Sequence, residues 1–194
     1  HHARRRAGVW RIAQEDRAMS NALLSIPTLH PYSMYSLGAS LRFVNDPGIE
    51  SIVSAAWPAA NRAIFVPFAI PMPMNVTKLW VCNGTSAAGN IDIGIYDHTG
   101  CRLTSTGSTA QAGTSALQVI SITAVLLSPG QFYLALAGDS TSPTTNRSAP
   151  TAEALREMGV FMQETAFALP ATATPAAMTS AYLPFFGLGT KWMV

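Results

Sequence analysis

The residues of this sequence whose types could support chemistry gather in one short stretch, Asp97-His98-Thr99-Gly100-Cys101. An imidazole beside a carboxylate, with a thiol three residues further on, could bind a metal ion or act as a Cys/His pair. The same stretch is typical of a turn in which Asp97 caps the backbone and Gly100 adopts a positive φ. We favour the turn, and we expect neither a metal ion nor a cofactor.

Other catalytic groups are sparse. The chain has four histidines and ten Asp and Glu residues, and no pair of carboxylates stands out. It contains no phosphate-binding loop, nucleophile elbow, Cys-x-x-Cys pair or His-Glu-x-x-His motif. Asp92, Asp97 and Asp139 could converge on calcium, but they lack the spacing of a calcium loop. We therefore expect no catalytic residues and no enzymatic activity.

Trp80 and Tyr96 are the candidate ligand-binding residues. If both lie on one outer sheet face, their rings could stack on a sugar, because sugars present apolar faces that aromatic rings cover. The alternative, which we favour, is that both rings pack under an N-terminal arm.

The elements that would position these residues are predicted to be β-strands. Ile91, Ile93 and Ile95 recur with a period of two, which indicates a strand, and residues 102–106 complete a hairpin after the turn. Further strands are predicted at residues 63–70, 76–82, 117–125 and 131–137. Short strands joined by Gly, Pro and Asn turns are typical of an antiparallel sandwich, here expected to be jelly-roll-like. Pro67 indicates an edge or a bulge.

The predicted faces of two strands define part of the core. Within 76–82, we expect Leu79 and Val81 on one face, and Val76 on the other together with Trp80. Phe132, Leu134 and Leu136 are expected to share a face of strand 131–137, since they also alternate.

The chain is predicted to divide into an N-terminal arm or belt, residues 1–56, and a β-sandwich domain, residues 57–194. Prolines in the arm favour extended geometry. Within the domain we predict a polar loop at 139–150 and a short helical insert at 152–158, capped by Thr151. The apolar end, 182–192, is expected to be a closing strand that docks on the sandwich or on a partner.

The composition favours a subunit of a larger assembly. Charged residues make up 11% of the chain and hydrophobic residues 48%, whereas roughly 25% charge is usual in soluble domains. Either small residues cover the surface, or much of it is buried against other subunits. The basic residues Arg4, Arg5 and Arg6 are interpreted as a solvated tail, so we do not expect nucleic acid as a partner.

Membrane spans and disulfides are not predicted. No apolar run reaches the roughly 18 residues that a membrane helix needs, so we expect no membrane partner. Cys82 and Cys101 are the only cysteines. They could pair if neighbouring strands carry them, but we favour buried free thiols.

Four stretches carry a resemblance to a known family: Asn61–Phe68, Leu79–Gly84, Asn90–Asp97 and Leu127–Ala135. The third ends in Gly-Ile-Tyr-Asp before a turn, and the fourth opens on Leu-Ser-Pro-Gly. Together they resemble a β-sandwich module of the virion proteins of tailed bacteriophages, over roughly residues 57–140. The resemblance implies a structural protein located in the virion.

The expected function is non-enzymatic binding of other virion proteins, as a capsid decoration (cement) or head-fibre protein. We expect a homo-oligomer, with three-fold symmetry favoured. The alternatives are a tail or baseplate fibre, or a carbohydrate-binding domain that recognises a receptor. The predicted assembly contacts are Arg4, Arg5, Arg6, Trp10, Tyr32, Tyr35, Phe185, Phe186 and Trp192.

Overall fold

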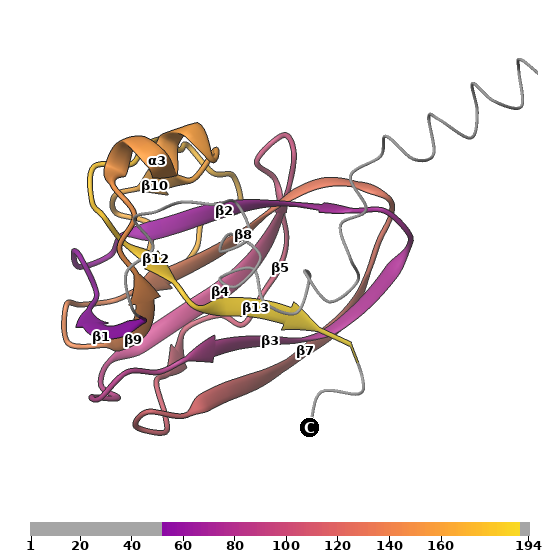
Figure 1. Ribbon diagram of the computed structural model, residues 1–194. Helices are drawn as coiled ribbons and strands as arrows, with labels where there is room; N and C mark the ends of the chain where they lie inside the picture. The colour runs from indigo at the N-terminus through magenta and orange to yellow at the C-terminus, as the bar shows by residue number, and fades with distance from the viewer. Residues whose placement is uncertain (1–51, 191–194) are drawn as a thin grey trace, which may run out of the picture. The chain divides into compact units, whose positions relative to one another are not determined.

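The structure of the protein is a computed structural model that describes residues 52–190 (Figure 1). These residues belong to the second of two units into which the chain divides, residues 31–194. Nearly all of the predicted arm therefore lies outside the described residues.

The described residues form an antiparallel β-sandwich, which confirms the predicted fold class. Strands are grouped in a seven-stranded sheet, a three-stranded sheet that faces it, and a second three-stranded sheet. The strands are β1 (Val53–Ala56), β2 (Ala63–Ile70), β3 (Met74–Cys82), β4 (Asn90–Asp97), β5 (Arg102–Ser105), β6 (Thr109–Ala110), β7 (Leu117–Leu127), β8 (Gly130–Gly138), β9 (Thr144–Ser148), β10 (Phe161–Gln163), β11 (Ala176–Ala177), β12 (Leu183–Pro184) and β13 (Phe186–Gly189).

The seven-stranded sheet has the order β11-β10-β2-β8-β4-β5, with β6 also paired to β4. In its central strands every second residue is a large apolar one, so these side chains share one buried face, as predicted for Ile91, Ile93 and Ile95. Phe132, Leu134 and Leu136 of β8 join the same core cluster. This face forms one half of the main core.

The facing sheet has the order β13-β3-β7. Leu79 and Val81 of β3 reach the main core, as expected, but Val76 joins them there. The prediction that Val76 lies on the opposite face is wrong, because the register of β3 against β7 shifts between Val76 and Lys78. A bulge of this kind changes which residues face the core.

The second three-stranded sheet, β1-β9-β12, corrects the prediction of a polar loop at 139–150. Thr144–Ser148 is a strand inside the predicted polar loop 139–150, and it pairs with β1 on one side and β12 on the other. β1, residues 53–56, is thus paired with the sandwich, whereas the division of the chain at residue 56 stays a prediction.

Two local predictions agree with the structure. The helix α3 (Ala152–Glu157) begins after Thr151, whose side chain accepts a hydrogen bond from the Ala154 N–H. Pro67 lies where β2 lacks a second neighbour, since β10 pairs with β2 only at Ala63–Phe65. A missing backbone donor is tolerated at such an open position.

The outer face of the seven-stranded sheet carries a second, smaller cluster. Phe65, Tyr96 and Ala135 of the sheet pack there against Ala166 and Leu169. These last two residues follow β10, so the segment between β10 and β11, residues 164–175, covers this face and is called the covering segment below.

Candidate functional site

The turn that holds His98 is closed by the Asp97 carboxylate. Its Oδ1 accepts hydrogen bonds from the Thr99 hydroxyl (2.6 Å), the Thr99 N–H (2.8 Å) and the Cys101 N–H (3.0 Å). The Thr99 hydroxyl is the main reason why the pKa of Asp97 lies below its usual value. Gly100 has a φ of +86°. The predicted turn is confirmed, and the Oδ1 atom of Asp97 is used by hydrogen bonds within this turn.

A metal site is not formed within residues 52–190. No group of three or more His, Cys, Asp or Glu side chains in this range could hold an ion. Asp97 ends β4, whereas Asp139 accepts hydrogen bonds at Asn90, which begins it. A strand of this length separates its ends by about 24 Å. The calcium alternative, which needed Asp92, Asp97 and Asp139 to converge, is therefore wrong.

Trp80 and Tyr96 do not share an outer face, which corrects that interpretation. Trp80 lies on β3 and Tyr96 on β4, in different sheets, and their exposed fractions are 6% and 0%. The Trp80 Nε1–H donates to the Leu188 carbonyl (3.3 Å), and the Tyr96 hydroxyl donates to the Pro170 carbonyl (2.7 Å). Burial raises the pKa of Tyr96. The Trp80 ring lies against Gly187 of the neighbouring strand β13, and the covering segment packs on Tyr96. The expectation that both rings pack under the N-terminal arm stays a prediction, because residues 1–51 lie outside the described part of the chain.

The predicted assembly contacts fall into two groups. Phe185 and Phe186 are 9% and 1% exposed, and Phe186 belongs to the main core. The closing strand prediction is confirmed, since β13 pairs with β3, and the Phe186 side chain is therefore not available to a partner. Outside the described residues lie Arg4, Arg5, Arg6, Trp10, Tyr32, Tyr35 and Trp192.

The cysteines are unpaired. Cys82 is half-buried and its Sγ accepts a hydrogen bond from Asn146 Nδ2 (3.1 Å), while Cys101 is exposed. The free thiols agree with the prediction, but the burial expected for Cys101 is wrong, because this residue follows the surface turn.

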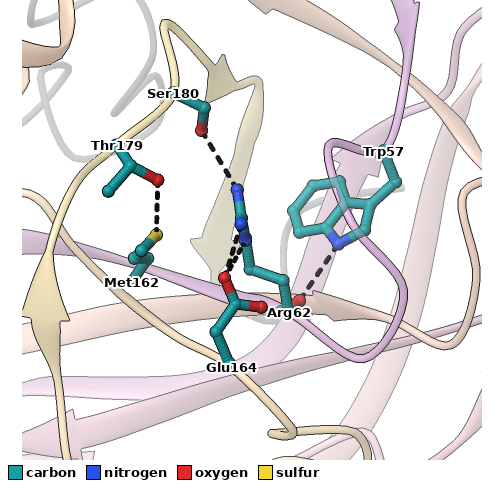
Figure 2. A network of polar contacts seen from close by, with 6 residues as sticks. All are labelled: Trp57, Arg62, Met162, Glu164, Thr179 and Ser180. Atoms are coloured by element: carbon teal, nitrogen blue, oxygen red, sulfur yellow. Dashed lines mark hydrogen bonds and ion pairs between the residues drawn. The ribbon is translucent and has the colours of Figure 1, made fainter.

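A polar network holds the covering segment to the start of β2 (Figure 2). The Arg62 guanidinium forms an ion pair with Glu164 and reaches the Ser180 hydroxyl (3.5 Å). The Arg62 carbonyl accepts a hydrogen bond from the Trp57 indole N–H (3.0 Å). Arg62 thus joins three chain segments and has a structural role.

The surface best suited to a partner is the edge of β7 that faces away from β3. Within the described residues β7 pairs only with β3, so the backbone groups on its other side lack a strand partner. Its sequence, Leu-Gln-Val-Ile-Ser-Ile-Thr-Ala-Val-Leu-Leu, contains no charged residue and no proline. Figure 1 shows β7 beside β3 at the border of the ribbon. Proteins usually protect such an edge with charge, proline or a covering element.

Apolar side chains are exposed at both ends of this edge. Leu117 is 50% and Leu126 68% exposed. Met72, 61% exposed, precedes β3 at the end where Met74 pairs with Leu127, so it lies at the same end of the sheet as Leu126. We call Leu117–Leu127 together with Met72 the β7 edge. The apolar composition of residues 117–125 predicted the strand, but its edge position depends on the sheet order, which no local pattern reveals.

No protein-family model matches the chain, and a search of curated proteins finds no match. Among solved structures, the chain is similar to one in "Structure of infectious bursal disease virus Gt strain", with 10% sequence identity and a TM-score of 0.31. The match covers 72% of this chain and 38% of that chain, so this chain spans well under half of its length. A likeness this weak carries no argument about function.

Membrane insertion by a helix finds no support in residues 52–190, where no helix has the length and apolar character that a crossing requires.

Proposed function

We propose that this chain is a non-enzymatic structural protein of a bacteriophage virion, a capsid decoration (cement) or head-fibre protein that binds neighbouring subunits. The observation that carries the proposal is the β7 edge, an uncharged strand of 11 residues that pairs with a strand on one side only and has exposed leucines. Near its start, Gln118 is hydrogen-bonded to Ala110 and Ala112, so the open part of the edge lies towards Leu126. A neighbouring strand or loop would satisfy its backbone groups and cover Leu117 and Leu126.

The energetics favour a repeated contact. Fully burying a leucine side chain stabilises by about 1.5–3 kcal/mol, so two half-exposed leucines contribute only a few kcal/mol per interface. That is weak for one pair of molecules, since association costs at least about 4 kcal/mol in lost freedom. In a symmetric assembly each subunit makes several such contacts. Their binding free energies add, so the assembly is stable although each contact is weak.

The low charge of the chain supports the same proposal. A surface with few charges gives little repulsion between copies, which is unfavourable for a free monomer but suits a subunit packed among others. The glycan-binding alternative has no comparable support in residues 52–190, because both rings on which it depended are buried.

The test is the oligomeric state of the full chain, measured by light scattering coupled to size exclusion. Thr123 and Leu126 are exposed on β7, and replacing both with lysine would place charges along the edge. Thr141→Lys adds the same kind of charge at an exposed position away from β7. We expect the wild type and Thr141→Lys to form the same oligomer and the β7 double variant to dissociate while remaining folded by circular dichroism. A monomeric wild type, or an oligomer that the double variant leaves intact, would contradict the proposal.

A further inference from the structure

A pocket of about 220 Å³ opens on the outer face of the seven-stranded sheet. Phe65 and Tyr96, which are 2% and 0% exposed, form its buried part, and Tyr133 and Phe161 are half-buried beside it. These four aromatic rings come from β2, β4, β8 and β10, four strands of one sheet. His98, from the surface turn, also lines the pocket.

The walls are held in place by hydrogen bonds that do not involve a ligand. The covering segment is fixed to the surface turn by the Ala173 N–H, which donates to the Gly100 carbonyl (2.8 Å). Next to it, the Thr174 N–H donates to Gln163 Oε1 (2.8 Å). The rings also pack edge to face, with centroids 5.2 Å apart for Phe65 and Tyr96. A pocket fixed on both sides requires little reorganisation to bind a ligand, which favours affinity.

The chemistry of the lining selects the ligand. Aromatic rings prefer another ring, packed edge to face or offset. The Tyr133 hydroxyl and the His98 imidazole accept no hydrogen bond from, and donate none to, any side chain or backbone group of the described range. Asp97, the carboxylate beside His98, is already occupied by its turn. The pocket therefore offers apolar walls, the polar groups of Tyr133 and His98, and the Thr99 hydroxyl, which already donates to Asp97. No carboxylate or guanidinium lines it.

The volume sets the size. A cavity of about 150 Å³ lined by apolar side chains is known to bind benzene, whereas drug-sized ligands need about 300–1,000 Å³. A pocket of about 220 Å³ therefore suits one ring with a small substituent.

We propose that this pocket binds a neutral phenolic ring, with the ring packed among Phe65, Tyr133 and Phe161 and its hydroxyl group hydrogen-bonded to His98 or Tyr133. The site goes beyond the assembly role, because it lies on a different sheet from the β7 edge. A free phenol and the side chain of a tyrosine share this chemistry.

The test uses the full chain and p-cresol, with binding followed by saturation-transfer NMR. Toluene serves as the matched ligand, because it keeps the ring and lacks the hydroxyl group. In the variant Tyr133→Phe/His98→Ala the aromatic walls remain but both polar groups are lost. We expect p-cresol to bind saturably and this variant to weaken p-cresol about three- to tenfold, the usual effect of one lost hydrogen bond, while toluene binding is unchanged.

Two further variants locate the site. Phe161→Ala should weaken both ligands, whereas Leu103→Ala, a change at an exposed apolar residue of β5, should weaken neither. N-acetyltyrosinamide separates the two sources: binding as tight as p-cresol supports a tyrosine side chain, and much weaker binding supports a free phenol. The absence of saturable p-cresol binding, or equal binding to the wild type, Phe161→Ala and Tyr133→Phe/His98→Ala, would overturn the proposal.

Discussion

The buried carboxylate of Asp92 and the side chain of Arg102 together hold both backbone groups of Leu169. Asp92 Oδ2 accepts a hydrogen bond from the Leu169 N–H (3.0 Å), and Arg102 donates to the Leu169 carbonyl. The Thr106 hydroxyl donates to the other carboxylate oxygen (3.2 Å). Leu169 packs on the outer face of the seven-stranded sheet, so this pair of contacts fastens the covering segment to β4 and β5.

Asp92 makes the stability of the domain depend on pH. Desolvation raises its pKa above the ordinary value of 3.8, and the hydrogen bonds from Leu169 and Thr106 only partly oppose this. Because the folded state holds this proton more tightly than the unfolded state, the free energy of unfolding falls as pH rises from about 4 through the folded pKa. Asp92→Asn removes that ionisation, so its loss of stability over this range should be smaller. Urea titrations between pH 4 and 7 measure the difference.

Two substitutions of Asp92 distinguish the contribution of its charge from that of its hydrogen bond. Asp92→Asn keeps an oxygen that can accept from the Leu169 N–H, whereas Asp92→Ala leaves that donor without a partner. We expect Asp92→Ala to cost about 1–3 kcal/mol at pH 7, and Asp92→Asn to cost less. Equal losses for the two variants would show that the hydrogen bond to Leu169 contributes nothing.

The ion pair between Arg62 and Glu164 should contribute modestly. Their side chains are 14% and 50% exposed, so solvent and salt screen the interaction. A double-mutant cycle with Arg62→Met and Glu164→Gln should give a coupling energy of about 0.5–1 kcal/mol, reduced further at 1 M salt. The i,i+3 pair of Glu153 and Arg156 on α3, at 75% and 45% exposure, is the matched surface control, and it should couple more weakly. A larger coupling on α3 would contradict this expectation.

The position of the Trp80 ring requires a glycine at residue 187, on the neighbouring strand. A Cβ at Gly187 would lie 2.3 Å from Trp80 Cζ2 and 2.4 Å from Cε2, and the two residues are register partners on β13 and β3. Gly187→Ala should therefore destabilise the domain by about 1–3 kcal/mol through overpacking. Combining it with Trp80→Leu removes the clash, so the double variant should be more stable than the sum of the single changes predicts. Additive losses, measured by urea denaturation, would refute the contact.

The two thiols should react at different rates. Cys101 is exposed, and Cys82 is half-buried with its Sγ hydrogen-bonded to Asn146. Ellman's reagent added to the native chain without reductant should label Cys101 in a fast phase and Cys82 in a slow one. The slow phase alone should remain in Cys101→Ser. A fast phase that persists in Cys101→Ser would contradict the exposure of Cys101.

The inward faces of the strands could be predicted from the sequence because their signal is local. Alternation in β4 and β8 places every second residue in the main core, and no distant information is needed. By contrast, β9 reads Thr-Thr-Asn-Arg-Ser, with no apolar alternation. It becomes a strand because β1 and β12 supply backbone partners on both sides.

The residues of the candidate sites could not be predicted from the sequence, because their contacts join segments that lie far apart along the chain. The contact of Asp92 with Leu169 spans 77 residues, and Trp80 lies beside Gly187 of β13, which is far along the chain. The pocket joins Phe65, Tyr133 and Phe161 from three strands whose order follows from tertiary pairing. Aromatic residues could be noticed in the sequence, but which of them share a face of one sheet could not.

β1 ties the start of the described residues to the sandwich. β1 contributes four register pairs to β9, from Val53↔Arg147 to Ala56↔Thr144. In addition, Ser54 Oγ accepts from the Thr85 N–H (2.8 Å), and the Tyr182 hydroxyl donates to the Ala55 carbonyl (3.0 Å). A chain that starts at residue 57 loses all of these contacts, whereas one that starts at residue 52 keeps them.

The shorter chain should therefore be less stable by about 2–4 kcal/mol, since each lost hydrogen bond is worth about 1 kcal/mol. Urea denaturation of the two truncated chains measures this, and equal stability would show that β1 is dispensable. Light scattering on the chain that starts at residue 52 then isolates the role of the arm, because that chain keeps both β1 and the β7 edge. An oligomer that survives this truncation assigns assembly to the sandwich. Loss of the oligomer in a fully stable chain assigns it to the residues before 52.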